Sequence, residues 1–135
     1  MNNEIRWQQR FQNFDRAYKQ FSQIATADLA KLSNLEKEGY VQRFEYTFEL
    51  AWKTLKDYLL DNGQDLSSPK EIIRQAFQNE IIVEGEVWME ALKKRNLTSH
   101  TYDDVVLVKT ITFLKDEFYP VMEKLHSRLA AEVVL

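Results

Sequence analysis

A chain of 135 residues, of which 44% are hydrophobic and 29% charged, is long enough to bury one core. The sequence therefore predicts one folded domain over residues 1–135 and excludes a disordered chain. The net charge of −3 excludes a protein that binds nucleic acid over its whole surface, because phosphate neutralisation needs clustered Lys and Arg. With no cysteine and only 2 histidines, the chain offers neither a disulfide framework nor a thiolate or all-histidine metal site.

The sequence also predicts a cytoplasmic protein. Its first residues, MNNEIRWQQRF, lack the apolar core of a secretory signal. No run approaches the roughly 18 apolar residues that a membrane-spanning helix requires. The absence of cysteine fits a reducing compartment.

The first predicted element is an amphipathic helix with an aromatic stripe. Its apolar residues recur at spacings of 4, 3, 4 and 3, which places them on one face: Trp7, Phe11, Phe14, Tyr18 and Phe21. Residues 25–35 mix small, polar and leucine residues, which leaves a short helical turn or a loop as alternatives.

A second helix is predicted from about Glu36 to Asp61. One face carries Phe44, Phe48, Leu55 and Leu59, with Trp52 at its edge. Asn62 and Gly63 end it as left-handed cap residues do.

The stretch SSPKE predicts the start of a third helix, which runs from Pro69 to about Asn79. Ser68 is the expected N-cap, Pro69 occupies the first helical position, and Glu71 is the expected capping-box partner. A fourth helix is predicted from near Glu86 toward Arg95.

A fifth, long helix is predicted from near Asp103. Its many β-branched residues suggest a strand, but their periodicity is helical at Leu107, Ile111, Leu114, Phe118, Val121, Leu125 and Leu129. Pro120 is expected to kink or interrupt this helix just before its own position.

These elements predict an all-α, up-and-down bundle of the four-helix type with an extra short helix. Three long amphipathic helices and two shorter ones, joined mostly by short connections, bury their apolar stripes most simply in this arrangement. The aromatic content is high for one small bundle, so we expect part of it to face a second copy in a homodimer.

Most catalytic motifs are excluded by the residues available. The sequence contains no H-E-x-x-H motif, EF-hand loop or Cys/His cluster, so no metal site is predicted. Its glycines, Gly39, Gly63 and Gly85, stand too far apart to form a P-loop or a dinucleotide fingerprint. The chain is therefore not itself expected to be a nucleotidyltransferase or a kinase.

The stretch KKRNLTSHTYD, residues 93–103, is the strongest candidate site. A guanidinium binds phosphate in a forked geometry and an imidazole transfers protons near neutral pH, so Arg95 and His100 together suit RNA cleavage without a metal. Asn96 is a candidate to hold a phosphate oxygen or to orient the histidine, and Lys94 adds positive charge beside them.

Structural roles are the alternative for these residues. An R-x4-H spacing alone is a weak motif, and a histidine near a helix terminus is commonly a cap or a surface residue. On the second helix, the polar residues are Arg43, Glu45, Glu49 and Lys53; an ion-paired solvated face is favoured there over a role in a cleft. Core packing is favoured over base stacking for Trp52 and Trp88.

The pattern R-x4-H-x-Y before the last long helix of a cysteine-free α-bundle resembles the HEPN family. The stretches RFEYTFELAWK (43–53), SPKEIIR (68–74) and W-x-x-A-L-x-x-R-N (88–96) are similar to its branch called nucleotidyltransferase substrate-binding protein. The similarity spans about residues 5–130.

The resemblance implies a function for each residue of the motif. Arg95 and His100 match the ribonuclease pair of HEPN toxins, which is assembled across a homodimer cleft, and Asn96 matches the polar residue that often follows the arginine. Tyr102 matches the tyrosine that a partner minimal nucleotidyltransferase modifies with AMP in toxin–antitoxin pairs. Packing of the Tyr102 ring against a neighbouring helix is the structural alternative.

Two functions follow from the resemblance. The first is a cytoplasmic, metal-independent ribonuclease toxin that binds nucleotide or RNA at Arg95 and His100 and is silenced by AMP on Tyr102. The second is a non-catalytic nucleotide- or substrate-binding subunit of a two-component nucleotidyltransferase. No cofactor is expected for either.

Overall fold

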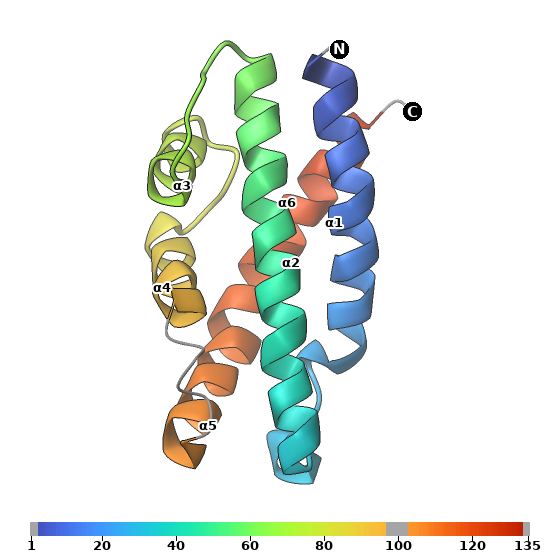
Figure 1. Ribbon diagram of the computed structural model, residues 1–135, viewed down its shortest axis with the longest axis vertical. Helices are drawn as coiled ribbons and strands as arrows, with labels where there is room; N and C mark the ends of the chain where they lie inside the picture. The colour runs from blue at the N-terminus through green and yellow to red at the C-terminus, as the bar shows by residue number, and fades with distance from the viewer. Residues whose placement is uncertain (1–2, 97–102, 134–135) are drawn as a thin grey trace.

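The computed structural model describes residues 3–96 and 103–133. All regular elements within these residues are helical (Figure 1). In chain order the elements are α1 (Asn3–Ala25), the 3₁₀ turn η1 (Leu29–Lys31), α2 (Asn34–Asp61), α3 (Pro69–Gln78), α4 (Gly85–Asn96), α5 (Asp104–Phe113), the π-helical turn η3 (Leu114–Phe118) and α6 (Tyr119–Glu132). No strand occurs within these two ranges. The predicted all-α fold is confirmed.

The long hairpin of α1 and α2 forms one side of the bundle, and the other helices pack beside it and behind it. Figure 1 shows α1 and α2 side by side and antiparallel, with α3 and α4 one after the other along the free side of α2. The segment α5–η3–α6 crosses behind this hairpin and contacts α2, α4 and α1 in turn. Both ends of the described chain lie at the same end of the bundle. The expected homodimer stays a prediction.

Side-chain caps fix where the helices begin and end. The Ser33 hydroxyl accepts from the Glu36 N–H at 3.1 Å, and the Glu36 carboxylate accepts from the Ser33 N–H at 2.9 Å. This capping box starts α2 at Asn34, two residues before the position that the apolar pattern predicts. The α3 cap is as predicted, because the Ser68 hydroxyl accepts from the Glu71 N–H at 3.1 Å. Gly63, at φ +84°, follows α2 in the left-handed conformation.

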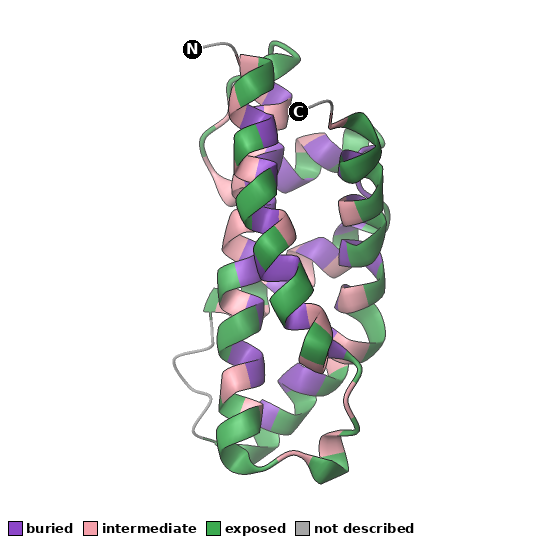
Figure 2. Ribbon diagram, turned by 90° about the vertical axis from the view of Figure 1, so that its right-hand side faces the viewer, coloured by how far each residue is buried: buried purple, intermediate pink, exposed green. Residues whose placement is uncertain are grey.

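The core is an aromatic cluster centred on Phe118. The Phe118 ring lies 5.0 Å from Trp88 and 5.7 Å from both Phe44 and Phe48, measured between ring centroids, and all four side chains are fully buried. The predicted stripes of α1, α2 and the last helix all face inward, as the buried positions in Figure 2 show. This cluster joins α2, α4 and η3 at one point.

The predicted irregularity before Pro120 is a π-helical turn. The N–H of Tyr119 donates to the carbonyl of Leu114, five residues back, and the chain remains helical on both sides. Pro120 has no N–H to donate to the carbonyl four residues before it, so the regular α-helical pattern is interrupted there. Both Leu114 and Phe118, the first and last residues of the turn, are fully buried.

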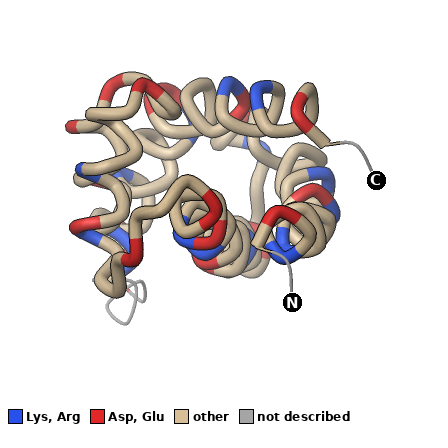
Figure 3. Tube along the Cα trace, turned by 90° about the horizontal axis from the view of Figure 1, so that it is seen from above, with Lys and Arg blue, Asp and Glu red and all other residues tan. Residues whose placement is uncertain are grey.

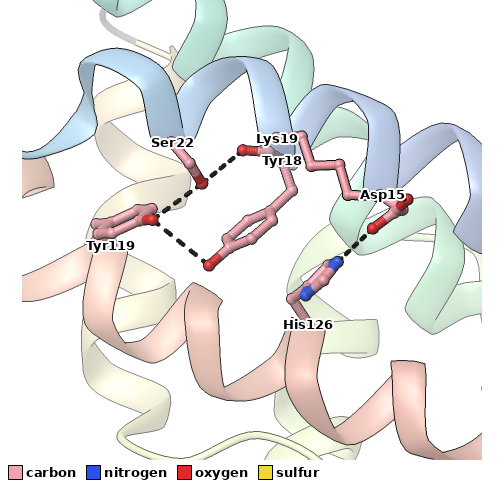
Figure 4. A network of polar contacts seen from close by, with 6 residues as sticks. All are labelled: Asp15, Tyr18, Lys19, Ser22, Tyr119 and His126. Atoms are coloured by element: carbon pink, nitrogen blue, oxygen red, sulfur yellow. Dashed lines mark hydrogen bonds and ion pairs between the residues drawn. The ribbon is translucent and has the colours of Figure 1, made fainter.

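A polar network ties α6 to α1 on the side of the bundle away from α4 (Figure 4). His126 Nε2 lies 2.7 Å from Asp15 Oδ1, and its ring stacks on Tyr18 with centroids 4.1 Å apart. Lys19 pairs with the other Asp15 oxygen at 3.0 Å. Next to this group the Tyr119 hydroxyl donates to Ser22 Oγ at 2.9 Å.

The charge of Asp15 is favoured by this network. Partial burial acts to raise the pKa of Asp15, but the hydrogen bonds with His126 and Lys19 and the positive charge of Lys19 outweigh it and lower the pKa below its ordinary value. A carboxyl whose pKa is lowered on folding stabilises the fold above its unfolded-state pKa. That stabilisation is lost as the pH falls through the folded-state pKa.

We predict that Asp15→Asn lowers the free energy of unfolding at neutral pH and that the difference from wild type narrows on acidification below about pH 4. Urea denaturation across this pH range measures both effects. Asp65→Asn, at an exposed position with no ion pair among the described residues, is the matched control and should follow wild type. A gap between Asp15→Asn and wild type that stays constant with pH would contradict the role given to Asp15.

Candidate functional site

Arg95, the arginine of the predicted motif, is directed at α2 by the way α4 packs. Trp88 and Ala91 are the fully buried side chains of α4, and Arg95 follows Trp88 by two helical turns, so both face the same side. The Trp88 ring lies near Phe48, with centroids 6.1 Å apart. Glu49 is the next residue on α2, and Arg95 Nη2 donates to its Oε2 at 2.5 Å.

The guanidinium has a second neighbour on its own helix. Arg95 Nη1 donates to Asn96 Oδ1 at 2.9 Å. The Arg95 side chain keeps 29% of its surface exposed, so it is held from two sides and still accessible. A guanidinium fixed in this way at a surface is suited to receive an anion in a defined orientation.

Glu49 lies between two cations. Besides Arg95, it pairs with Lys53 through its other oxygen at 3.7 Å, one helical turn along α2. Partial burial acts to raise the pKa of Glu49, but the hydrogen bond from Arg95 and the charges of Arg95 and Lys53 lower the pKa below its ordinary value. The ion pair with Lys53 that the sequence predicts is therefore present, and it belongs to a larger group that includes Arg95.

Beside this ion pair is an open surface pocket of about 500 Å³. It is lined by Gln42, Glu45, Tyr46, Glu49 and Arg95. The four α2 residues are spaced at i, i+3, i+4 and i+7, which makes them one outward-facing stripe, opposite the buried stripe of the same helix. Arg95 is the contribution of α4 to this pocket.

The structure separates some of the predicted residues and leaves others undescribed. Arg95 and Asn96 lie together, whereas Lys94 pairs with Glu90 at 3.6 Å and lines a different pocket with Phe113 and Glu117. The binding role of Lys94 stays a prediction, but it is not part of the Arg95 pocket. His100 and Tyr102 lie outside the described residues, so their roles also stay predictions.

On α2 the polar residues divide between two sides. Arg43 turns toward α1, where it donates to the carbonyl of Gln20 at 2.8 Å, and it does not line the pocket. Glu45 and Glu49 do line it. The sequence favours a solvated, ion-paired face for all four residues. Arg43 and Lys53, which do not line the pocket, fit this assignment better than Glu45 and Glu49 do.

The sequence analysis missed Tyr46. Trp52 and Trp88 are buried, at 8% and 0% exposure, as expected for core residues. Tyr46 is 58% exposed and lines the pocket. The signal that could have found it is its position, three residues before Glu49 and off the apolar stripe of α2.

Charges of both signs are interspersed along the described helices (Figure 3). Within the same residues, no three His, Asp or Glu side chains gather as candidate metal ligands. No helix found there is long and apolar enough to cross a membrane. The pocket with Arg95 is thus a local site on a surface of mixed charge.

Comparison with known proteins agrees with this fold. Part of the chain, 70 residues or 48% of its length, is 36% identical to the "Probable ribonuclease HepT" of Haemophilus influenzae, and the aligned region spans 48% of that relative. A crystal structure of a protein from Thermus thermophilus superposes with a TM-score of 0.80 at 31% identity, covering 86% of this chain and 98% of the other.

The helical bundle with an Arg-Asn pair at the end of the helix before its last long helical segment is that of a HEPN-like domain. Residues 9–131 match the family described as "Nucleotidyltransferase substrate binding protein like", and the chain belongs to this family. The resemblance seen in the sequence is confirmed.

We predict that the pair Glu49–Arg95 stabilises the fold more than an exposed ion pair does. In a double-mutant cycle with Glu49→Gln and Arg95→Gln, we expect a coupling free energy of about 1 kcal/mol, because the two side chains form a direct hydrogen bond between α4 and α2. Urea denaturation of the four proteins measures it.

The matched control is a cycle on Glu90 and Lys94, an i, i+4 pair on α4 at 3.6 Å. Its coupling should be about 0.3–0.5 kcal/mol. A Glu49–Arg95 coupling no larger than this value would mean that Glu49 does not hold Arg95 in solution.

Proposed function

We propose that this chain is the HEPN-type partner of a minimal nucleotidyltransferase and that it cleaves RNA with Arg95 and His100, without a metal. The observation that carries the proposal is the Arg95 guanidinium, held by Glu49 and Asn96 at the edge of an open pocket. The name of the Haemophilus relative, a probable ribonuclease, supports an RNA substrate. The family description supports a nucleotidyltransferase as partner.

In the proposed reaction, the 2′-hydroxyl of one nucleotide attacks the adjacent phosphorus. A new P–O2′ bond forms, the P–O5′ bond breaks, and the products are a 2′,3′-cyclic phosphate and a 5′-hydroxyl. His100 transfers one proton, either from the attacking hydroxyl or to the leaving oxygen, and water supplies or accepts the other. Arg95 stabilises the additional negative charge that develops on the phosphoryl oxygens.

Glu49 matters for this chemistry because it sets the position of the cation. The Glu49 carboxylate accepts a hydrogen bond from Nη2 of Arg95, and the Arg95 side chain remains partly exposed at the pocket. Glu49 pairs with Lys53 as well as with Arg95, so its negative charge does not fully neutralise the arginine. Within the group formed by Glu49, Lys53 and Arg95, two cations face one carboxylate, which favours a phosphate at the Arg95 end of the pocket.

Regulation by AMP is the second part of the proposal. AMP attached to Tyr102, two residues after His100, would bring a phosphate and a negative charge close to the motif. Such a group would compete with RNA for Arg95. We further propose that the active form is a cytoplasmic homodimer, in line with the toxin–antitoxin resemblance.

A second candidate function is a non-catalytic subunit that binds a nucleotide or another substrate for the nucleotidyltransferase. The description of the matched family as substrate binding favours it. The same Arg95 pocket would then hold the ligand without cleaving it. The two functions differ in whether RNA is cut.

We predict that the purified protein cleaves single-stranded RNA in EDTA and that Arg95→Ala and His100→Ala each lower the rate by about 10²–10³-fold. Gel analysis of end-labelled RNA measures the rate and reveals the 2′,3′-cyclic phosphate. Arg128→Ala, which removes an arginine of another pocket, is the control and should cleave as wild type does. Cleavage that persists in His100→Ala would contradict the catalytic assignment, and binding without cleavage would favour the second function.

We also predict that the cognate nucleotidyltransferase, supplied with ATP, adds one AMP-sized mass to the chain. Intact-mass spectrometry should show the increase in wild type and in Tyr46→Phe but not in Tyr102→Phe. Modified protein should lose cleavage activity. An unmodified wild-type chain under these conditions would contradict regulation through Tyr102.

A further inference from the structure

Tyr46 is the most exposed aromatic side chain in the described part of the chain, at 58% of its surface. Among these residues no ring packs against it, and its hydroxyl has no hydrogen-bond partner. The other large aromatic residues of α2, such as Phe44 and Phe48, are fully buried. An exposed ring with no aromatic contact and no hydrogen bond among these residues is available for a ligand.

The position of Tyr46 relates it to Arg95. Tyr46 is three residues before Glu49, roughly 4.5 Å along the axis of α2, and Glu49 holds the guanidinium of Arg95. Both Tyr46 and Arg95 line the same open pocket. A single nucleotide spans a comparable separation between its phosphate and its base.

Charge distinguishes the two ends of the pocket. At one end, Glu49 is paired with two cations, Arg95 and Lys53. At the other end, Glu45 has no cationic partner among the described residues. A phosphate is attracted to the first end and repelled from the second, whereas the amino group of a base is attracted to a carboxylate.

We propose that Tyr46, Glu45 and Gln42 form a binding subsite for an unpaired nucleobase next to the phosphate bound by Arg95. The ring of Tyr46 stacks on the face of the base. The carboxylate of Glu45 accepts a hydrogen bond from an amino group at the edge of the base, and the amide of Gln42 makes a further polar contact. The inference deepens the proposed function and rests on it for the phosphate at Arg95.

The subsite requires a base that is not paired. In a duplex both faces of each base are covered by stacking, and the edge used here is occupied by its complement, so single-stranded RNA is the substrate class. The subsite also favours bases that carry an amino group. Uracil has no amino donor for Glu45, and we expect adenine to bind better.

The experiment measures binding of fluorescein-labelled 2′-O-methyl oligonucleotides. These lack the attacking 2′-hydroxyl, so the protein cannot cleave them by the proposed reaction. Oligoadenylate, oligouridylate, an abasic oligomer of the same length and a duplex are compared by fluorescence anisotropy. The variants are Tyr46→Ala, Tyr46→Phe, Glu45→Gln and Arg95→Ala. Glu38→Gln, on α2 outside the pocket, is the control for loss of a carboxylate.

We predict that Tyr46→Ala weakens oligoadenylate binding by roughly tenfold or more and that Tyr46→Phe does not, because the ring and not the hydroxyl carries the stacking. The abasic oligomer should bind weakly, depend on Arg95 and be indifferent to Tyr46→Ala. Glu45→Gln should reduce the preference for oligoadenylate over oligouridylate, and Glu38→Gln should leave it unchanged.

Two results would overturn the subsite and leave the proposed function in place. One is binding that depends on Arg95 but is the same in Tyr46→Ala and wild type. The other is a change of particle mass in Tyr46→Ala, measured by light scattering, because Tyr46 would then belong to an interface between copies of the chain. Failure of wild type to bind any of the oligomers would overturn both the subsite and the proposed RNA substrate.

Discussion

The position of the candidate site depends on the burial of Trp88 against Phe48 and Phe118. Trp88 has no exposed surface, and the rings of Phe118 and Phe48 lie 5.0 and 6.1 Å from it, so the rotation of α4 about its axis is fixed. Two helical turns later, that rotation directs Arg95 at α2. The aromatic core is therefore what places the guanidinium beside Glu49, and the fully buried Trp88 determines the geometry of the pocket.

Charge at this pocket is arranged locally, and the rest of the surface contributes little to it. The chain carries a net charge of −3, and its basic and acidic residues are interspersed along the helices (Figure 3). Attraction of the proposed phosphate ligand would consequently depend on Arg95, with Glu49 and Lys53 as its immediate neighbours. Because a single oriented guanidinium with few other cations would bind the ligand, affinity would depend more on the position of the ligand's phosphate than on the ligand's total charge.

Much of the fold could be predicted from the sequence, because periodicity and caps are local properties of the chain. The buried stripes and the Ser68 cap are examples. The site was harder to predict, because neighbouring residues of a helix point in different directions. Lys94 is next to Arg95 in the sequence, yet it pairs with Glu90 and lines a separate pocket. The contact between Glu49 and Arg95 joins residues 46 positions apart, and only the packing of α4 on α2 reveals it. Tyr46 could not be distinguished from core aromatic residues by composition alone.

The proposed base subsite and the proposed AMP modification of Tyr102 have a chemical connection. AMP contains a phosphate and an adenine, which are the two groups that Arg95 and the Tyr46 subsite are proposed to bind. An AMP group on Tyr102 would then resemble a bound nucleotide in both parts, and occupation of both would inhibit RNA binding more strongly than the added charge alone. In that case Tyr46→Ala, which removes the stacking surface, would weaken inhibition by AMP even in a protein whose Tyr102 is fully modified.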